Sequence, residues 1–162
     1  MADRAIQDLY EGPASHCYGC GTRNEQGLHI RSYWDGVRAV ACFHPRPYHT
    51  GIPGYAYGGL IASVVDCHGT ATAAAAAHQA AGGTFDTGPL PRFVTAALQV
   101  DYLQPVPVDR PMEIRGEVQE RTPRKVVVGV SVLSGGELCA RGRVVAVRMP
   151  ERWVSPSPGR AR

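Results

Sequence analysis

Gly59, Asp66 and Thr70 share one face of a long predicted helix. Gly58 and Gly59 open an apolar segment with helical spacing, and Asp66 follows Gly59 by seven residues. Backbone amides in the first turn of a helix have no intrahelical acceptor and lie at the positive end of the helix dipole. Glycine there lets a ligand carbonyl approach closely, so these two amides are candidates for an oxyanion hole.

Asp66 is surrounded by apolar neighbours in the same segment, and Thr70 follows it by one helical turn. Desolvation raises the pKa of a carboxyl group and makes it a better base. Thr70 is expected to hydrogen-bond the carboxylate or a water; the alternative is a bond back to its own helix. An acid near amides that hold an oxyanion suits attack of water on a carbonyl, so we predict acyl transfer to water with Asp66, Gly58, Gly59 and Thr70 as the catalytic set.

These residues need a long helix to position them. Apolar spacing and an alanine run predict a helix over about 57–81, which Gly82 and Gly83 end. Alternating residues predict about six strands, near 28–34, 37–43, 95–102, 112–119, 126–133 and 138–146. Asp35-Gly36 and Gly135-Gly136 are hairpin turns, and 45–54 is a long loop. We therefore expect an α+β fold, with an antiparallel sheet curled around one helix inserted after the second strand.

The composition suits a single globular domain. The chain has 162 residues, 44% hydrophobic and 19% charged, with a net charge of +3. We expect an N-terminal extension over 1–15, one domain over 16–149 and a disordered basic tail over 150–162. The small net charge argues against nucleic acid as a partner, and no apolar run approaches a membrane span.

The cysteines predict a reducing compartment. We expect no signal peptide at the N-terminus. Because the chain also holds five cysteines, an odd number, we expect reduced thiols in the cytoplasm. Cys17 and Cys20 have the spacing of a metal motif, but a second such pair is lacking. A zinc site would have to use His16 and one distant ligand, so we expect a glycine-rich structural turn and no metal.

Three motifs resemble the hotdog-fold acyl-CoA thioesterases of the PaaI-like branch. The first is Tyr57-Gly58-Gly59, followed after six residues by Asp66 in the long helix. The second is the opening His16–Gly21, then Asn24 and Gly27-Leu28. The third is the segment 98–106, similar to the family's strand after the helix. The resemblance covers about residues 17–147.

The resemblance implies a site at a dimer interface, where helix amides polarise the thioester carbonyl and the helix acid comes from the other subunit. The substrate would be an acyl-CoA or an acyl-carrier thioester, and the assembly a homodimer or a dimer of dimers. No cofactor is implied, because coenzyme A is part of the substrate. The candidate substrate-binding residues are Asn24, His49, Tyr57 and Ser63. Tyr57 stands where the family usually has histidine, and it keeps a hydrogen-bond donor without the charge.

Two alternatives remain open at this point. The same fold could bind an acyl thioester without turnover, as a sensing or accessory module. It could also be a dehydratase, which usually needs a differently placed Asp–His pair. Four basic residues are candidates either for contacts to the coenzyme A phosphates or for ordinary surface charge: Arg92, Arg121, Arg124 and Lys125.

Overall fold

The computed structural model describes residues 4–85, 89–150 and 153. The predicted tail over 150–162 therefore lies outside the described residues, apart from Pro150 and Trp153.

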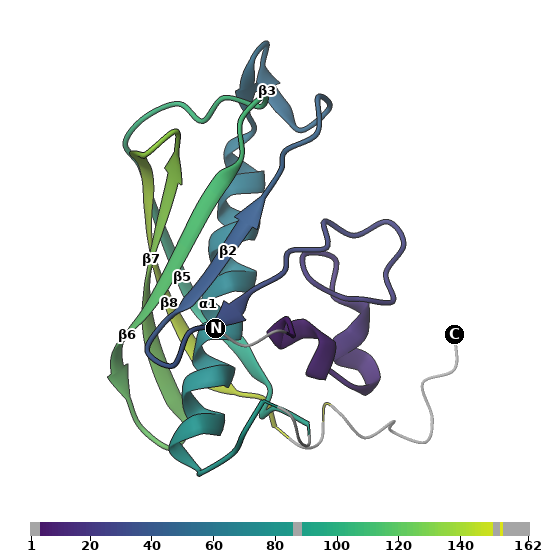
Figure 1. The fold of residues 1–162 in the computed structure, drawn as a ribbon, viewed down its shortest axis with the longest axis vertical. Helices are drawn as coiled ribbons and strands as arrows, with labels where there is room; N and C mark the ends of the chain where they lie inside the picture. The colour runs from purple at the N-terminus through teal and green to yellow at the C-terminus, as the bar shows by residue number, and fades with distance from the viewer. Residues whose placement is uncertain (1–3, 86–88, 151–152, 154–162) are drawn as a thin grey trace.

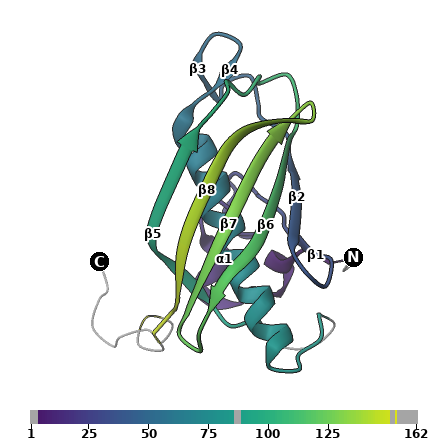
Figure 2. The same ribbon diagram turned by 90° about the vertical axis from the view of Figure 1, so that its left-hand side faces the viewer.

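One six-stranded antiparallel sheet forms the main layer (Figure 2). Its strands lie in the order β1-β2-β6-β7-β8-β5, so that β5 is an edge strand. The strands are β1 (Tyr33–Trp34), β2 (Ala39–Phe43), β5 (Phe93–Tyr102), β6 (Met112–Arg121), β7 (Lys125–Ser134) and β8 (Glu137–Arg148). The predicted sheet is thus confirmed, and Gly135 and Gly136 form the turn between β7 and β8 with φ values of +60° and +84°.

Helix α1 (Gly58–Ala80) lies along the concave face of the sheet (Figures 1 and 2). It ends at Ala80 and is capped by Ala81, and Gly82 follows with φ +79°, the left-handed conformation that glycine adopts without strain. By length and composition α1 could cross a membrane, but most of it is buried inside the protein, as in the core helix of a globular fold. Burial against the sheet therefore accounts for its apolar character.

The sheet approaches α1 closely where glycine replaces a side chain. A Cβ added at Gly142 on β8 would lie 2.2 Å from Cγ1 of Val65, and one at Gly116 on β6 would lie 2.3 Å from Oγ1 of Thr72. Within the helix, a Cβ at Gly69 would lie 2.5 Å from Cγ2 of Val144. Because these glycines have no side chain, the backbone of the curved sheet can pack directly against the helix.

The N-terminal segment forms a third layer on the side of α1 away from the sheet (Figure 1). It contains the 3-10 helices η1 (Ile6–Leu9) and η2 (Gly12–His16). Ile6 is fully buried, and its amide donates to the carbonyl of Ser32 at 2.7 Å. The Ser32 hydroxyl lies 2.8 Å from Nδ1 of the buried His68 on α1. The buried residues of this segment thus share the core of the sheet and helix.

The predicted first hairpin differs from the structure. The strand expected over 28–34 is reduced to Tyr33–Trp34, because the amides of Leu28 and Ile30 instead donate to the carbonyls of Tyr18 and Gly19, at 2.8 and 2.9 Å. The turn is also shifted by one residue, because the Asp35 amide donates to the carbonyl of Arg38 at 3.0 Å and so encloses Gly36 and Val37.

The predicted loop over 45–54 also contains regular structure. Strand β3 (Thr50–Ile52) pairs with β4 (Tyr55–Ala56) as a small separate hairpin, beyond one end of the main sheet (Figure 2). The Ala56 amide donates to the carbonyl of Val106 at 2.8 Å, which ties this hairpin to the segment after β5. The hairpin leads directly into the first residue of α1.

Candidate active site

Asp66 lies half-buried on α1 and faces the edge strand β5. The hydroxyl of Thr95 on β5 donates a hydrogen bond to its carboxylate. Burial raises the pKa of Asp66 above its usual value, and the Thr95 hydrogen bond opposes that shift. The carboxylate is therefore fixed in direction and made more basic than an exposed aspartate, as a general base requires.

Thr70 and Ser63 both bond back to their own helix. The Thr70 hydroxyl donates to the main-chain oxygens of Asp66 and Cys67, each at 3.1 Å, and not to the Asp66 carboxylate. The Ser63 hydroxyl donates to the main-chain oxygen of Gly59 at 2.9 Å. Thr70 thus bonds back to its own helix and does not support the Asp66 carboxylate, whose side-chain partner is Thr95.

The start of α1 presents free amides beside two tyrosines. The first helical hydrogen bonds are donated by Leu60 and Ile61 to the carbonyl of Tyr57, at 3.0 and 3.3 Å. The amides of Gly58 and Gly59 precede them, so they have no acceptor within the helix. These are the donors that the sequence predicts for a carbonyl oxygen.

Both glycines lie under tyrosine rings. A Cβ at Gly59 would lie 2.3 Å from Cε1 of Tyr57, and one at Gly58 would lie 3.5 Å from Cε1 of Tyr102. The Tyr102 hydroxyl also donates to the carbonyl of Gly58 at 2.9 Å. The Tyr57 ring therefore occupies the space that the missing Gly59 side chain leaves, and Tyr102 holds the first helical turn from β5.

A cavity of about 300 Å³ opens at this end of α1. It brings together four of the predicted residues, namely Gly59, Tyr57, His49 and Ser63. The other lining residues are Tyr18, Leu28, Tyr48, Thr50 and Leu60. Aromatic and aliphatic side chains thus surround a few polar groups, as in sites for small organic ligands.

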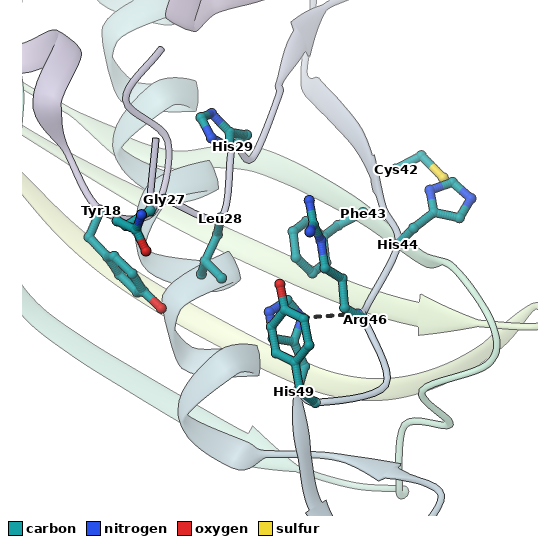
Figure 3. A pocket seen from close by; sticks show the side chains of 11 residues that line it. Tyr18, Gly27, Leu28, His29, Cys42, Phe43, His44, Arg46 and His49 are labelled. Carbon is teal, nitrogen blue, oxygen red and sulfur yellow. Dashed lines mark hydrogen bonds between the residues drawn. The ribbon is translucent and has the colours of Figure 1, made fainter. Parts of the chain in front are cut away.

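His49 connects this cavity to a second one of about 230 Å³ (Figure 3). Its Nδ1 accepts from the Arg46 amide at 3.1 Å, which leaves the proton on Nε2, and its ring stacks on Phe43 at 6.0 Å. Burial and the charge of Arg46 lower the pKa of His49. Its carbonyl accepts from the Tyr57 amide at 2.9 Å. His49 is therefore a neutral, oriented donor between the two cavities.

Two parts of the chain line the second cavity (Figure 3). One part is Tyr18 with Gln26–His29, and the other comprises Cys42, Phe43, His44, Arg46, Tyr48 and His49. The Arg46 side chain extends from the second part. A cation at this position would suit a negatively charged part of a ligand that extends from the first cavity.

The structure places other predicted residues elsewhere. Asn24 does not line either cavity; its amide donates to the carbonyl of His16 at 3.2 Å, and its side-chain oxygen accepts from Gln26. Arg92 lies over the Tyr10 ring, 3.9 Å from its centroid, and Arg121 donates to the carbonyl of Ala76 at 3.2 Å. Both guanidinium groups therefore have intramolecular contacts.

Sequence reasoning missed Thr95 and Tyr102. Simple alternation along 95–102 places Thr95 on the polar face of the predicted strand with Gln99 and Asp101, but the register shifts between Thr95 and Ala97. A β-bulge changes which face each residue occupies, so a period of two cannot be followed across it. No sequence pattern could indicate the role of Tyr102, because its contact with Gly58 joins residues 44 positions apart.

The comparisons with known proteins agree with this geometry. The family model described as the thioesterase superfamily matches residues 53–140, more than half of the chain and including α1. A thioesterase superfamily protein of Shewanella loihica PV-4 is 46% identical, with a TM-score of 0.67, over 89% of this chain and 99% of that one. The PaaI protein of the phenylacetic acid degradation operon of E. coli has a TM-score of 0.62 at 15% identity, over 76% and 81% of the two chains, which shows the shared hotdog fold alone.

Acyl-coenzyme A thioesterase THEM4 of Xenopus laevis is 34% identical over 97 residues. The match covers 60% of this chain but only 38% of that protein. The family model matches more than half of the chain, and the sheet that curves around α1 has the hotdog arrangement. The chain is therefore a hotdog-fold member of the thioesterase superfamily.

Proposed function

We propose that this protein hydrolyses acyl-coenzyme A thioesters to the free acid and the thiol. The observation that carries the proposal is the half-buried Asp66 carboxylate, held by Thr95 and raised in pKa, on the same helix as the free amides of Gly58 and Gly59. Asp66 would deprotonate water or attack the carbonyl directly. The amides would hold the oxyanion that develops as the carbonyl carbon becomes tetrahedral.

The acid and the amides can meet at one carbonyl group only if a second copy of the chain supplies one of them. Asp66 follows Gly59 by seven residues, a rise of roughly 10 Å along the helix, whereas reacting groups must lie about 3 Å from the same carbonyl. The ten-residue strand β5 pairs with β8 on one side only among the described residues, and Leu98 on it is 40% exposed. Because an exposed edge pairs readily with another chain, we infer a homodimer in which each site combines the amides of one protomer with the partner subunit's Asp66.

The cavities support a thioester of moderate size. The apolar cavity at Gly59 would take the acyl group or the pantetheine arm, and Arg46 in the adjoining cavity would face an anionic part of coenzyme A. The name of THEM4 supports coenzyme A over a carrier protein as the thiol. All five cysteines are free, which suits the reducing cytoplasm that we propose as its location.

A panel of acyl-CoAs tests the activity. Release of free thiol is measured for the wild type, for Asp66→Ala and for Glu120→Ala, an exposed carboxylate on β6 that serves as control. We expect Asp66→Ala to lose at least ~10²-fold in rate, and Glu120→Ala to retain the wild-type rate. Unchanged turnover in Asp66→Ala would exclude Asp66 from the chemistry. Acyl-CoA binding by the wild type without thiol release would favour a binding module.

Complementation between subunits tests the shared site. Asp66→Asn and Gly59→Val are each expected to be nearly inactive, since one lacks the acid and the other obstructs the amides. When the two are co-expressed, each mixed dimer contains one intact site, so about a quarter of the wild-type activity should return. Absence of any recovery in dimers shown to be mixed would mean that both groups act within one protomer.

A further inference from the structure

Three cysteines from distant parts of the chain meet beside α1. The Sγ atoms of Cys17, Cys20 and Cys67 all lie within 4.8 Å of one another, and those of Cys17 and Cys67 are 3.8 Å apart. Cys20 and Cys67 are buried, and Cys17 is half-buried. The distant ligand that a metal site at Cys17 and Cys20 would need is therefore supplied by Cys67 on the helix.

The turn that carries Cys17 and Cys20 is shaped around the third sulfur. A Cβ added at Gly19 would lie 2.3 Å from Sγ of Cys67, so only glycine lets that sulfur enter the turn. The Gly21 amide donates to the carbonyl of Cys17 at 2.8 Å, and a Cβ at Gly21 would lie 2.5 Å from the Cys17 nitrogen. Both glycines are thus required by close approach within the cluster.

We propose that Cys17, Cys20 and Cys67 bind a soft divalent cation, Zn²⁺, through three thiolates. A tetrahedral zinc with bonds of about 2.3 Å to sulfur separates its ligand sulfurs by about 3.8 Å. The Cys17–Cys67 distance already equals that separation. Three thiolates leave one tetrahedral position, which water or an external ligand fills from the side of Cys17, the most exposed of the three.

The metal itself would supply the charge that the cluster needs. A bound Zn²⁺ deprotonates the thiols that coordinate it, so the sulfurs need not be thiolates before the ion binds. Three thiolates and Zn²⁺ carry one net negative charge, and the half-buried Cys17 leaves one side of the cluster open to solvent.

The metal would join two layers of the fold. Cys17 and Cys20 lie in the turn that follows η2 of the N-terminal layer, whereas Cys67 directly follows Asp66 on α1. A bridging ion would stabilise the N-terminal layer against the helix, and this role does not depend on whether the protein hydrolyses thioesters. A disulfide between two of the thiols would leave the third without a function, which is why we favour the metal.

Cobalt substitution tests the proposal on the full chain. The reduced, chelator-treated protein is titrated with Co²⁺ and then with Zn²⁺, and absorption is recorded. We expect one equivalent of Co²⁺ to produce the intense near-ultraviolet band of thiolate-to-cobalt charge transfer, with the visible bands of tetrahedral Co²⁺, and Zn²⁺ to remove both. Absence of the charge-transfer band in the wild type overturns the proposal, as does a native mass lower by two hydrogens, which shows a disulfide.

Serine variants assign the ligands. Cys17→Ser, Cys20→Ser and Cys67→Ser should each lose most of the charge-transfer band, whereas Cys42→Ser and Cys139→Ser should retain it, because those thiols lie outside the cluster. Circular dichroism checks that each variant is folded. If a buried variant fails to fold, the half-buried Cys17→Ser decides the matter: a full band in that variant contradicts the assignment.

Discussion

The hydroxyl of Thr95 on the edge strand β5 donates a hydrogen bond to the carboxylate of Asp66 on helix α1. This contact joins residues 29 positions apart and sets the direction of the carboxylate. It also opposes the effect of burial on the pKa of Asp66, because a hydrogen bond to the charged form lowers a carboxyl pKa whereas desolvation raises it. The basicity of Asp66 therefore depends on a strand that also forms the open edge of the sheet.

Removing the Thr95 hydroxyl should change the pH profile of the proposed thioester hydrolysis. In Thr95→Val the carboxylate loses a hydrogen bond to its charged form, so its pKa should rise further. The acidic limb of the profile of kcat/KM against pH should then move to higher pH. At pH values below the shifted limb, kcat/KM should be about 10-fold or more lower than in the wild type. Thr95→Ser keeps the hydroxyl and should retain the wild-type limb. An acidic limb that is the same in all three proteins would show that it belongs to another group.

Gly59→Ala should separate activity from stability. The new Cβ would displace the ring of Tyr57, which is the flexible end of an exposed side chain, so the fold should tolerate the change. Alanine gains up to about 1 kcal/mol over glycine in a helix, although less at its first turn. We expect a lower kcat/KM for thioesters with an unchanged or higher Tm. Gly58→Ala meets Tyr102 only at ordinary contact distance and should retain more activity; equal losses in both variants would contradict a specific role for the Tyr57 position.

Gly142→Ala should destabilise the fold through α1. Its Cβ would lie 2.2 Å from Cγ1 of Val65, a β-branched side chain with little freedom to move. Such overpacking typically lowers the free energy of unfolding by about 1–3 kcal/mol, which urea denaturation can measure. Val65→Ala should also destabilise, by creating a cavity. The double variant should be more stable than the sum of the two changes predicts, and strict additivity would mean that the two residues are not in contact.

Acid should destabilise the protein through His68. Burial lowers the pKa of His68 from 6.5 to about 4, so between these values the unfolded chain binds more protons than the folded one. The stability is therefore complete above pH 6.5 and falls as the pH falls toward 4. We expect this group to lower the free energy of unfolding by about 2 kcal/mol between pH 7.5 and pH 5.

His68→Gln is the control for that measurement. It should start less stable, because Ser32 and the carbonyl of Ala39 lose their imidazole partner, at 2.8 and 3.2 Å in the wild type. Its unfolding free energy should change less between the two pH values. The same pH dependence in wild type and variant would place the titration on other groups.

Much of the fold and of the candidate site could be predicted from local pattern. The alanine-rich helix, the glycines at its two ends, the later strands and the spacing from Gly59 to Asp66 depend on residues that are close in the sequence. Helical period, propensity and turn chemistry operate over such short distances. The sequence therefore determined one long buried helix, with bare amides at its start and an acid along its length.

Only the tertiary structure decided which side chains meet. Thr95 reaches Asp66 because a bulge shifts the register of β5, and Cys67 reaches Cys17 because the N-terminal layer folds onto the helix from 50 residues away. The amides of Leu28 and Ile30 bond to that cysteine turn and not to the neighbouring strand, so the predicted first strand is short. Contacts of this kind arise from packing between elements, which a one-dimensional pattern does not encode.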